Sequence, residues 1–399
     1  MRRLLLELGA DLLGGGMAVH EVEQSLRDLG AALGAPDVCV AAVPTGLFVA
    51  LGPDQATAYR SVGPALRFEQ TADVLDLENR LRTGALDVHD AMGALTAIRR
   101  TPARWPAWVS DLGVVPIGAG LCLLLQPALP NIIAALLGSL IVAGLLALTR
   151  HWPPLRPLLP VSAGFTVSLL VLAAAQASLL DGSLRTIVAI LAVLLPGSLL
   201  VTGLSEIAAG AITAGTSRLM SGTVQLVLFL TGITVAAAII HAPSHDLSNQ
   251  LVAHAGWWAP WTGLALAVLG IVINVNTPLR ATPHIAAVVA VTAAVQLPVQ
   301  TAWGPAAGGL TAAIAASTAA TVVHWLPGGP SWQVAYLPAF WIVVPGSFGL
   351  LSTAQLTTGN ATHSLITAVS AVIAVSVGTL IGSVISHTPR PTRHQLSPH

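Results

Sequence analysis

Two short motifs of proline, glycine and serine occupy corresponding places in two apolar segments of the chain. They are Pro196-Gly197-Ser198 and Pro345-Gly346-Ser347, which lie 149 residues apart. Proline removes a backbone donor and clashes with the preceding turn, so we expect each helix to break there, with Ser198 or Ser347 as the N-cap of a second half-helix. The N–H groups that open such a half-helix can bind a carboxylate without placing a full charge in apolar surroundings.

The simpler interpretation of each motif is a proline kink whose serine bonds back to its own helix. For one isolated motif we would prefer that interpretation. Two copies at related positions favour a pair of broken helices that together form a binding site.

A carboxylate follows the first motif. Ser198, Thr202 and Ser205 fall at helical spacing and form one polar stripe, with Glu206 beside it. Carboxylates inside membrane segments are costly and frequently functional, so Glu206 is a candidate for proton coupling or for binding an ammonium group. It also lies toward the end of its segment, where a salt bridge to Arg218 would cost little. Both interpretations stay open, with the salt bridge slightly favoured.

Two amide side chains complete the candidate set. Gln355 takes the place of Glu206 after the second motif, so an acidic role rests on Glu206 alone. Asn274 could line a path through the membrane, although capping the chain before Pro278 is the more ordinary role.

Other polar clusters point to no chemistry that we can name. His20, Glu21, Glu23, His89 and Asp90 invite a catalytic interpretation, but each fits the polar face of an amphipathic helix. The histidines between residues 241 and 254 match no metal-binding spacing, and there is no Gly-rich phosphate loop. We therefore expect no metal, no cofactor and no nucleic-acid partner.

The charges are distributed very unevenly, and this defines the surroundings of the chain. Of the 34 charged residues, 24 lie in the first 111 positions, and residues 281–389 contain none. A soluble fold must present charge to water, so the long uncharged part predicts a lipid bilayer as its solvent.

The first 110 residues predict a small α+β domain. Leucines and valines at helical spacing cover the first 33 residues, and residues 38–42 and 47–51 predict two strands joined by a turn. Two helices follow near 70–83 and 87–100, the second with Asp87 as its N-cap. Prolines and tryptophans at 101–108 indicate entry into the membrane.

Ten apolar segments follow this domain. They run approximately over 112–128, 132–149, 158–176, 185–204, 220–240, 259–275, 283–299, 305–325, 333–351 and 363–385. Placing the N-terminal domain in the cytoplasm puts nine arginines on that side and only Arg185 on the other, which is the bias typical of an inner-membrane protein. The C-terminus is then cytoplasmic as well.

The shift of 149 residues that aligns the two motifs also aligns the first five apolar segments with the last five. Residues 111–256 and 257–389 are therefore interpreted as two membrane repeats, followed by a tail at 390–399. Because five is odd, the second repeat must enter the membrane from the opposite face. Such inverted repeats are common in secondary transporters, where they allow inward-open and outward-open states of similar energy.

Several stretches resemble the bacterial threonine/serine exporter family. They are GGGMAVHEVEQSLRDLGAALG (14–34), PTGLFVAL (44–51), GALDVHDAMGALTAIRRTPARWPAW (84–108), LLPGSLLVTGLSEIAAGAITAGTSRL (195–220) and PGSFGLL (345–351). They follow the family's domain order over essentially the whole chain. The resemblance implies export of threonine and serine across the plasma membrane, driven by the proton-motive force as in an antiporter. One departure is that neutral Gln355 stands where the second motif would carry an acidic residue.

The sequence as a whole therefore predicts a transporter and not an enzyme. A small amino acid would bind at the midplane between the two broken helices, with Glu206 and Arg218 serving proton coupling. One alternative keeps this fold and changes the substrate to a small dicarboxylate, which the resemblance implies for split two-subunit members. Another is a membrane-anchored enzyme that acts through its N-terminal domain. A homo-oligomer is also compatible with the sequence.

Overall fold

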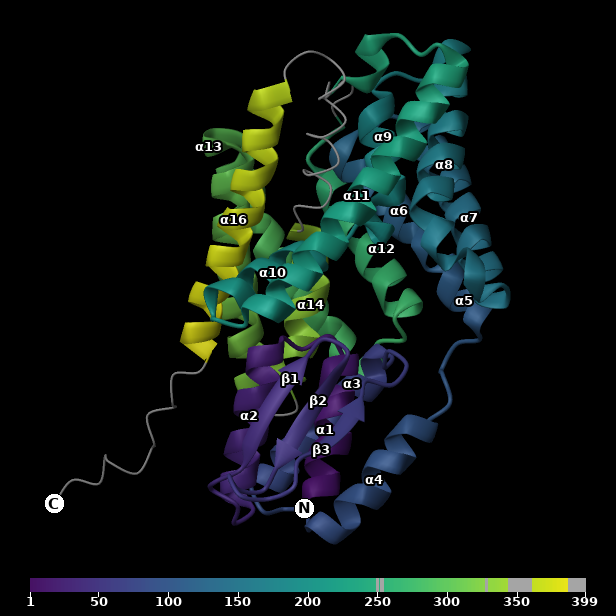
Figure 1. The fold of residues 1–399 in the computed structure, drawn as a ribbon. Helices are drawn as coiled ribbons and strands as arrows, with labels where there is room; N and C mark the ends of the chain where they lie inside the picture. The colour runs from purple at the N-terminus through teal and green to yellow at the C-terminus, as the bar shows by residue number, and fades with distance from the viewer. Residues whose placement is uncertain (249–250, 252–254, 327–328, 344–360, 387–399) are drawn as a thin grey trace, which may run out of the picture.

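The computed structural model describes the 399-residue chain except for residues 249–250, 252–254, 327–328, 344–360 and 387–399. A small domain of helices and strands lies at one end of a larger bundle of helices (Figure 1). The chain enters the bundle through the short segment 101–106.

The N-terminal domain contains four helices and a three-stranded antiparallel sheet in the order β1-β2-β3. Its elements are α1 (Arg2–Gly14), α2 (Val19–Ala32), β1 (Cys39–Val43), β2 (Gly46–Ala50), β3 (Ala58–Ser61), α3 (Phe68–Arg82) and α4 (Val88–Arg100). The predicted hairpin and the two helices that follow it are confirmed to within two residues. Asp87 accepts the N–H of His89, so it is the N-cap that the sequence predicted. Strand β3 was not predicted, because its exposed residues show no alternation.

Helix α1 is the central element of this domain. It contacts β2, β3 and the other three helices, and Leu4, Leu5 and Leu8 are fully buried. Two acidic side chains of α1, Glu7 and Asp11, are buried with them and meet Arg99 of α4 at 2.6 and 2.9 Å. Burial raises the pKa of Asp11, against the opposing effect of Arg99. A buried ion cluster thus fixes the last helix of the domain to the first.

The bundle begins with α5 (Ala107–Leu112), which runs on into α6 (Val114–Leu125), so the predicted domain boundary at 110 falls inside the first apolar helix. The later helices follow the predicted segments. They are α7 (Leu129–His151), α8 (Leu159–Gln176), α9 (Ser183–Leu191), α10 (Gly197–Ala208), α11 (Ile212–Ile240), α12 (Trp258–Asn274), α13 (Thr282–Trp325), α14 (Trp332–Val343) and α16 (Ala361–Ser386). In the described part of the bundle, short 3-10 turns lie between some of them, namely η1 (Pro153–Leu158), η2 (Ala192–Leu194), η3 (Ser244–Leu247) and η4 (Leu279–Ala281).

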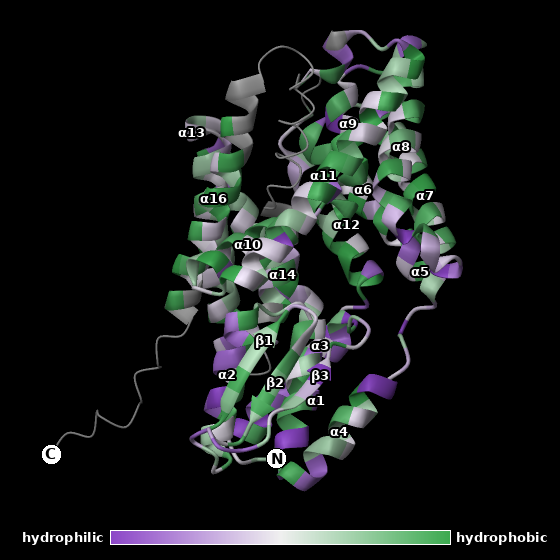
Figure 2. Cartoon of the chain, viewed as in Figure 1, coloured by the Kyte–Doolittle hydropathy of each residue, from purple (hydrophilic) through white to green (hydrophobic). Residues whose placement is uncertain are grey.

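Within the described residues, five helices are long and apolar enough to cross a membrane, or six if α9 and α10 count as one bent span. Their outer faces carry exposed apolar side chains; on α7 these include Leu129, Ile133 and Leu137. Figure 2 shows this apolar character along the bundle, in contrast to the charged N-terminal domain. These features are those of a polytopic membrane protein. The count of ten spans stays a prediction.

Helix α13 is two arms joined at Gly304, whose φ of 85° is a left-handed conformation. A Cβ placed on Gly308 would lie 2.6 Å from the Cβ of Gln300, so the chain folds back on itself there. The two arms correspond to the predicted segments 283–299 and 305–325.

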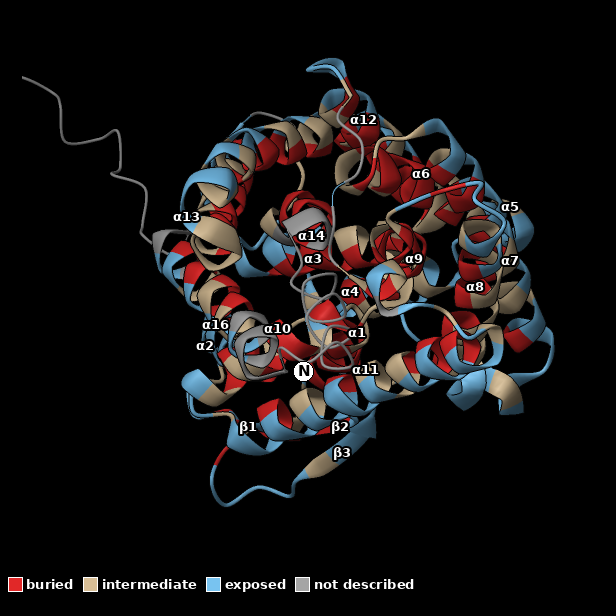
Figure 3. Cartoon of the chain, turned by 90° about the horizontal axis from the view of Figure 1, so that it is seen from above, coloured by how far each residue is buried: buried red, intermediate tan, exposed pale blue. Residues whose placement is uncertain are grey.

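Helices α6 and α12 pack against each other with almost no space between their backbones. A Cβ on Gly263 would lie 2.6 Å from the carbonyl oxygen of Gly120, and a Cβ on Gly270 would lie 2.6 Å from that of Gly113. Residue numbers rise in opposite directions across this contact, so α6 and α12 are antiparallel. Seen from above (Figure 3), α9 and α14 lie inside a ring formed by α6, α7, α8, α11, α16, α13 and α12.

We expect Arg99→Met to destabilise the N-terminal domain by about 3 kcal/mol, because Glu7 and Asp11 would remain buried without their main partner. Hydrogen exchange of the α1 amides, converted to free energies of opening, measures the loss. Arg100→Met, on an exposed neighbouring residue, is the matched control and should change little.

The same variant should show a pH dependence. Because the pKa of Asp11 is raised in the folded state, protonation of its carboxyl group stabilises the fold. This stabilisation is fully present at pH values below the ordinary pKa of 3.8, and it is lost as the pH rises through the raised pKa. Without Arg99 the pKa of Asp11 rises further, so the deficit of Arg99→Met should shrink as the pH is lowered from 7. A deficit that stays constant would contradict the burial of an uncompensated carboxylate.

Candidate functional site at the break between α9 and α10

The apolar segment that carries the first motif is broken in its middle. Residues 183–194 and the helix α10 meet at an angle of 64°. Pro196 is the N-cap of α10, because its carbonyl oxygen accepts the N–H of Leu200 at 3.1 Å. The predicted break is therefore confirmed. Ser198 is the second residue of the helix and not its N-cap, which corrects the prediction by two positions.

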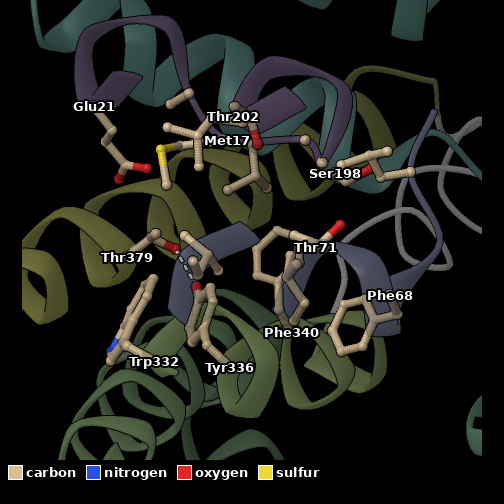
Figure 4. A pocket seen from close by; sticks show the side chains of 18 of the residues that line it. Met17, Glu21, Phe68, Thr71, Ser198, Thr202, Trp332, Tyr336, Phe340 and Thr379 are labelled. Atoms are coloured by element: carbon tan, nitrogen blue, oxygen red, sulfur yellow. Dashed lines mark hydrogen bonds between the residues drawn. The ribbon is translucent and has the colours of Figure 1, made fainter. Parts of the chain in front are cut away.

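A cavity of about 520 Å³ lies against α10 (Figure 4). Its walls come from α10, α14, α16, the end of α12, single residues of α1 and α11, and the N-terminal parts of α2 and α3 with the glycine-rich turn before α2. Among the predicted site residues, Ser198, Thr202, Asn274 and Arg218 line this cavity. The structure thus places the candidate site between the helix bundle and the N-terminal domain.

One wall of the cavity is aromatic. Trp332, Tyr336 and Phe340 recur every fourth residue on α14 and all face the cavity. The rings of Trp332 and Tyr336 stack with centroids 4.5 Å apart, and those of Tyr336 and Phe340 are tilted at 5.5 Å. The Tyr336 hydroxyl is 2.9 Å from Oγ1 of Thr379 on α16, which fixes the central ring.

The opposite wall carries the charged groups. Glu21 belongs to the first turn of α2, Arg67 precedes α3, and Arg218 belongs to α11. Both arginines already have carboxylate partners, since Arg67 lies 3.1 Å from Glu69 and Arg218 lies 3.2 Å from Glu206. Among the described lining residues, Glu21 is the one acidic side chain.

Glu206 connects the bundle to the N-terminal domain. Its side chain is fully buried, and one carboxylate oxygen accepts the N–H of Val19, the first residue of α2, at 2.8 Å. The N-cap residue of α2 is Ala18, which has no side-chain acceptor, so Glu206 supplies the capping oxygen from another part of the chain. Arg218 completes the contact by donating to the carbonyl of Met17 at 3.4 Å.

This geometry favours the salt-bridge interpretation of Glu206. The carboxylate lies beside the cavity and is not part of its lining. The roles of Glu206 and Arg218 in proton coupling stay predictions.

The start of α3 makes a second connection, to the end of α12. The N–H of Phe68 donates to the carbonyl of Val275 just after α12, at 3.3 Å. The Phe68 ring is 8% exposed and packs in the cluster that contains Leu264 and Val268 of α12. The N-terminal domain is therefore attached to α10 and α11 and also to the end of α12.

Asn274 has a structural partner. Its side-chain amide donates to the carbonyl of Ser110 at 2.8 Å. Asn276, which has a left-handed φ of 54°, donates to the Ser110 hydroxyl and accepts the N–H of Trp105. These contacts join the end of α12 to the segment that enters the bundle. Asn274 reaches the cavity as part of this joint.

The second motif lies outside the described residues. Pro345, Gly346, Ser347 and Gln355 all belong to 344–360, so the expected second broken helix stays a prediction.

The sequence did not identify the aromatic wall or Glu21 as parts of the site. The four-residue spacing of Trp332, Tyr336 and Phe340 is visible in the sequence. It does not predict the direction in which that face of the helix points. Glu21 was assigned to a solvated polar face. A catalytic site in the N-terminal domain would have to bring His20, Glu23 and His89 together. His20 lines the cavity, whereas Glu23 and His89 do not.

Comparison with known proteins gives one match. A family model described as "Putative threonine/serine exporter" matches residues 3–240. That range covers the N-terminal domain and the helices up to the end of α11. No curated protein and no solved structure matches the chain.

We expect Glu206→Leu to loosen the start of α2, because the variant removes both the capping acceptor and the partner of Arg218. Hydrogen exchange of amides 19–22 should speed up by about tenfold to a hundredfold, as for the loss of a hydrogen bond to a charged group. Glu206→Gln keeps an acceptor oxygen and should have a smaller effect. Unchanged exchange in α8 serves as the control for global unfolding, and unaltered exchange at 19–22 would contradict the docking role.

Proposed function

This chain belongs to the threonine/serine exporter family, and on that premise we propose that it exports small amino acids, threonine and serine first, by secondary active transport. The fold supports this proposal with several apolar helices able to span a membrane. We propose the plasma membrane as its location, with the N-terminal domain and the C-terminus in the cytoplasm.

The observation that carries the proposal is the cavity at the start of α10. The first amides of an α-helix have no acceptor within the helix, and they carry the positive end of its dipole. Ser198 and Thr202 add two hydroxyl groups on the cavity side of the same helix. The start of α10 is therefore suited to hold the carboxylate of an amino acid, with Pro196 and Gly197 setting the direction of the helix.

Alternating access would follow from two inverted repeats, and the contact between α6 and α12 supports this layout. Gly113 and Gly263 lie 150 positions apart, as do Gly120 and Gly270, one more than the offset of the motifs. Gly113 meets Gly270, and Gly120 meets Gly263. This exchange of partners is what a two-fold axis between equivalent helices produces.

A second likeness between the halves is the pairing of their third and fifth helices. Helix α8 packs on α11, where a Cβ on Gly164 would lie 2.7 Å from the carbonyl oxygen of Phe229. The second arm of α13 packs in the same manner on α16, where a Cβ on Gly378 would lie 2.7 Å from the carbonyl oxygen of Leu310. The two halves thus share a helix arrangement as well as a motif.

We further propose that Glu206 links proton movement to the position of the N-terminal domain. Protonation of its carboxylate would remove the charge that holds Arg218 and would weaken the bond from Val19. Release of α2 would then open the cavity on the side of the N-terminal domain. Proton-motive force would drive export through this connection.

Export of threonine and serine from peptide-fed cells is the direct test. Cells that express the chain and hydrolyse a threonine dipeptide should accumulate extracellular threonine. Ser198→Leu should abolish this accumulation by filling the carboxylate end of the cavity, and Thr202→Val should lower the export rate about tenfold by removing one hydrogen bond to a charged group.

Thr223→Val is the matched control, because Thr223 is an exposed residue of α11 whose hydroxyl bonds within its own helix. It should export at the wild-type rate. The proposed function fails if the wild-type chain adds no threonine or serine to the medium.

A further inference from the structure

We propose that the aromatic wall on α14 binds the side chain of the transported amino acid, so that the site takes amino acids with large apolar side chains, such as phenylalanine, as well as threonine and serine. This inference rests on the proposed function and identifies the side-chain end of the same site.

The first argument is that the polar groups of the wall are used within the protein. The indole N–H of Trp332 donates to the carbonyl of Ser317 at 3.2 Å. The hydroxyl of Thr379 donates to the carbonyl of Val375 at 2.9 Å, so in the pair of Tyr336 and Thr379 the tyrosine is the donor. The wall has no donor left for a substrate hydroxyl, and it presents aromatic rings to the cavity.

The second argument is that the wall is already in place without a substrate. The rings of Tyr336 and Phe340 are buried, and each of the three rings contacts its neighbour along α14. They lie across the cavity from Ser198 and Thr202 (Figure 4). A fixed apolar surface costs little conformational entropy when a side chain packs on it. A carboxylate held at α10 would therefore direct its side chain toward a ready surface.

The size and lining of the cavity are the third argument. More than half of the described lining residues are apolar, and they include Leu199 and Val201 of α10 and Leu337 of α14. The volume of about 520 Å³ exceeds what serine needs, since a water molecule occupies about 30 Å³ in the liquid. Bound serine would leave water against the rings, which is unfavourable for apolar surface, whereas an aromatic side chain would displace that water.

The wall also bears on the choice between the two transport hypotheses. A small dicarboxylate bound by one end at α10 would direct its second carboxylate toward Trp332, Tyr336 and Phe340, none of which carries a positive charge. Burial of a carboxylate against rings without a partner is strongly unfavourable. The wall therefore favours an amino acid with an apolar side chain over a dicarboxylate.

The aromatic residues also have a packing role. Tyr336 and Phe340 belong to a buried apolar cluster with residues of α12 and α13. A role limited to packing would affect every substrate in the same way. Selectivity between large apolar and small polar substrates is therefore the property that separates the two roles.

The experiment uses the full-length chain in proteoliposomes loaded with labelled threonine and measures how serine, valine and phenylalanine inside the vesicles compete with its efflux. We expect phenylalanine to compete at about a tenth of the concentration that serine requires, or less, because it buries one large apolar side chain. Valine should fall between them. Labelled phenylalanine should itself leave the vesicles, and protein-free vesicles measure its leakage through the bilayer.

Phe340 is the residue to change, because its ring carries no polar group and its removal breaks no hydrogen bond. Phe340→Ala should raise the half-saturating phenylalanine concentration about tenfold and that of threonine less than about twofold. Phe340→Leu keeps an apolar side chain and should recover part of the difference. These concentrations do not depend on how much of the variant protein is active, so reduced folding does not imitate a change in selectivity.

Trp303→Ala is the matched control. Trp303 is 75% exposed on α13 and is not among the described lining residues. This variant should keep the wild-type half-saturating concentrations for both phenylalanine and threonine.

The outcomes are distinct. If phenylalanine competes no better than serine, or if Phe340→Ala changes the concentrations for phenylalanine and threonine equally, the wall does not bind the side chain, and threonine efflux still supports the proposed function. Release of phenylalanine without threonine or serine would contradict the proposed function and leave the role of the wall in place. Release of none of the three would overturn both.

Discussion

The arrangement of this protein depends on one buried carboxylate that caps a helix belonging to another domain. Glu206 accepts the N–H of Val19 and pairs with Arg218, and all three groups come from different helices. An unpaired carboxylate at this depth would be strongly unfavourable, so the bundle and the N-terminal domain hold each other in place. The cavity is a product of this attachment, because α2 and α3 form the wall opposite α14. Without the docked domain the cavity would lose the wall that α2 and α3 form.

The N-terminal domain contacts the bundle at two separate places. The start of α2 is attached at α10 and α11, whereas the start of α3 is attached at the end of α12. Any motion of α12 relative to α10 and α11 must therefore strain or release one of these two contacts. The contact through Phe68 combines one backbone hydrogen bond with apolar packing, while that through Glu206 depends on charge. The two attachments consequently respond to different influences, one to solvent and temperature, the other to protonation.

Local signals in the sequence identified most of the elements, and long-range partners account for what they missed. The break at Pro196, the hairpin and the N-cap at Asp87 follow from residues within a few positions of each other. The acceptor of Val19 lies 187 residues away, and no spacing rule connects the two. The same holds for the aromatic wall, whose residues are regularly spaced but gain their meaning only from the direction in which α14 faces. Asn274 was placed at the right end of its helix, yet its partner Ser110 could not be predicted from the sequence.

The glycine contact between α6 and α12 has a mechanical consequence. Four glycines bring the two backbones into contact, and at those four positions no side chain can change rotamer or slide past its neighbour. Translation of one helix along the other would drive carbonyl oxygens into Cα atoms, whereas a small rotation about the point of contact meets little resistance. In a rotation of α6 relative to α12 this contact would act as a pivot, with displacements smallest beside it and larger toward α14 and α16, which line the cavity together with the end of α12.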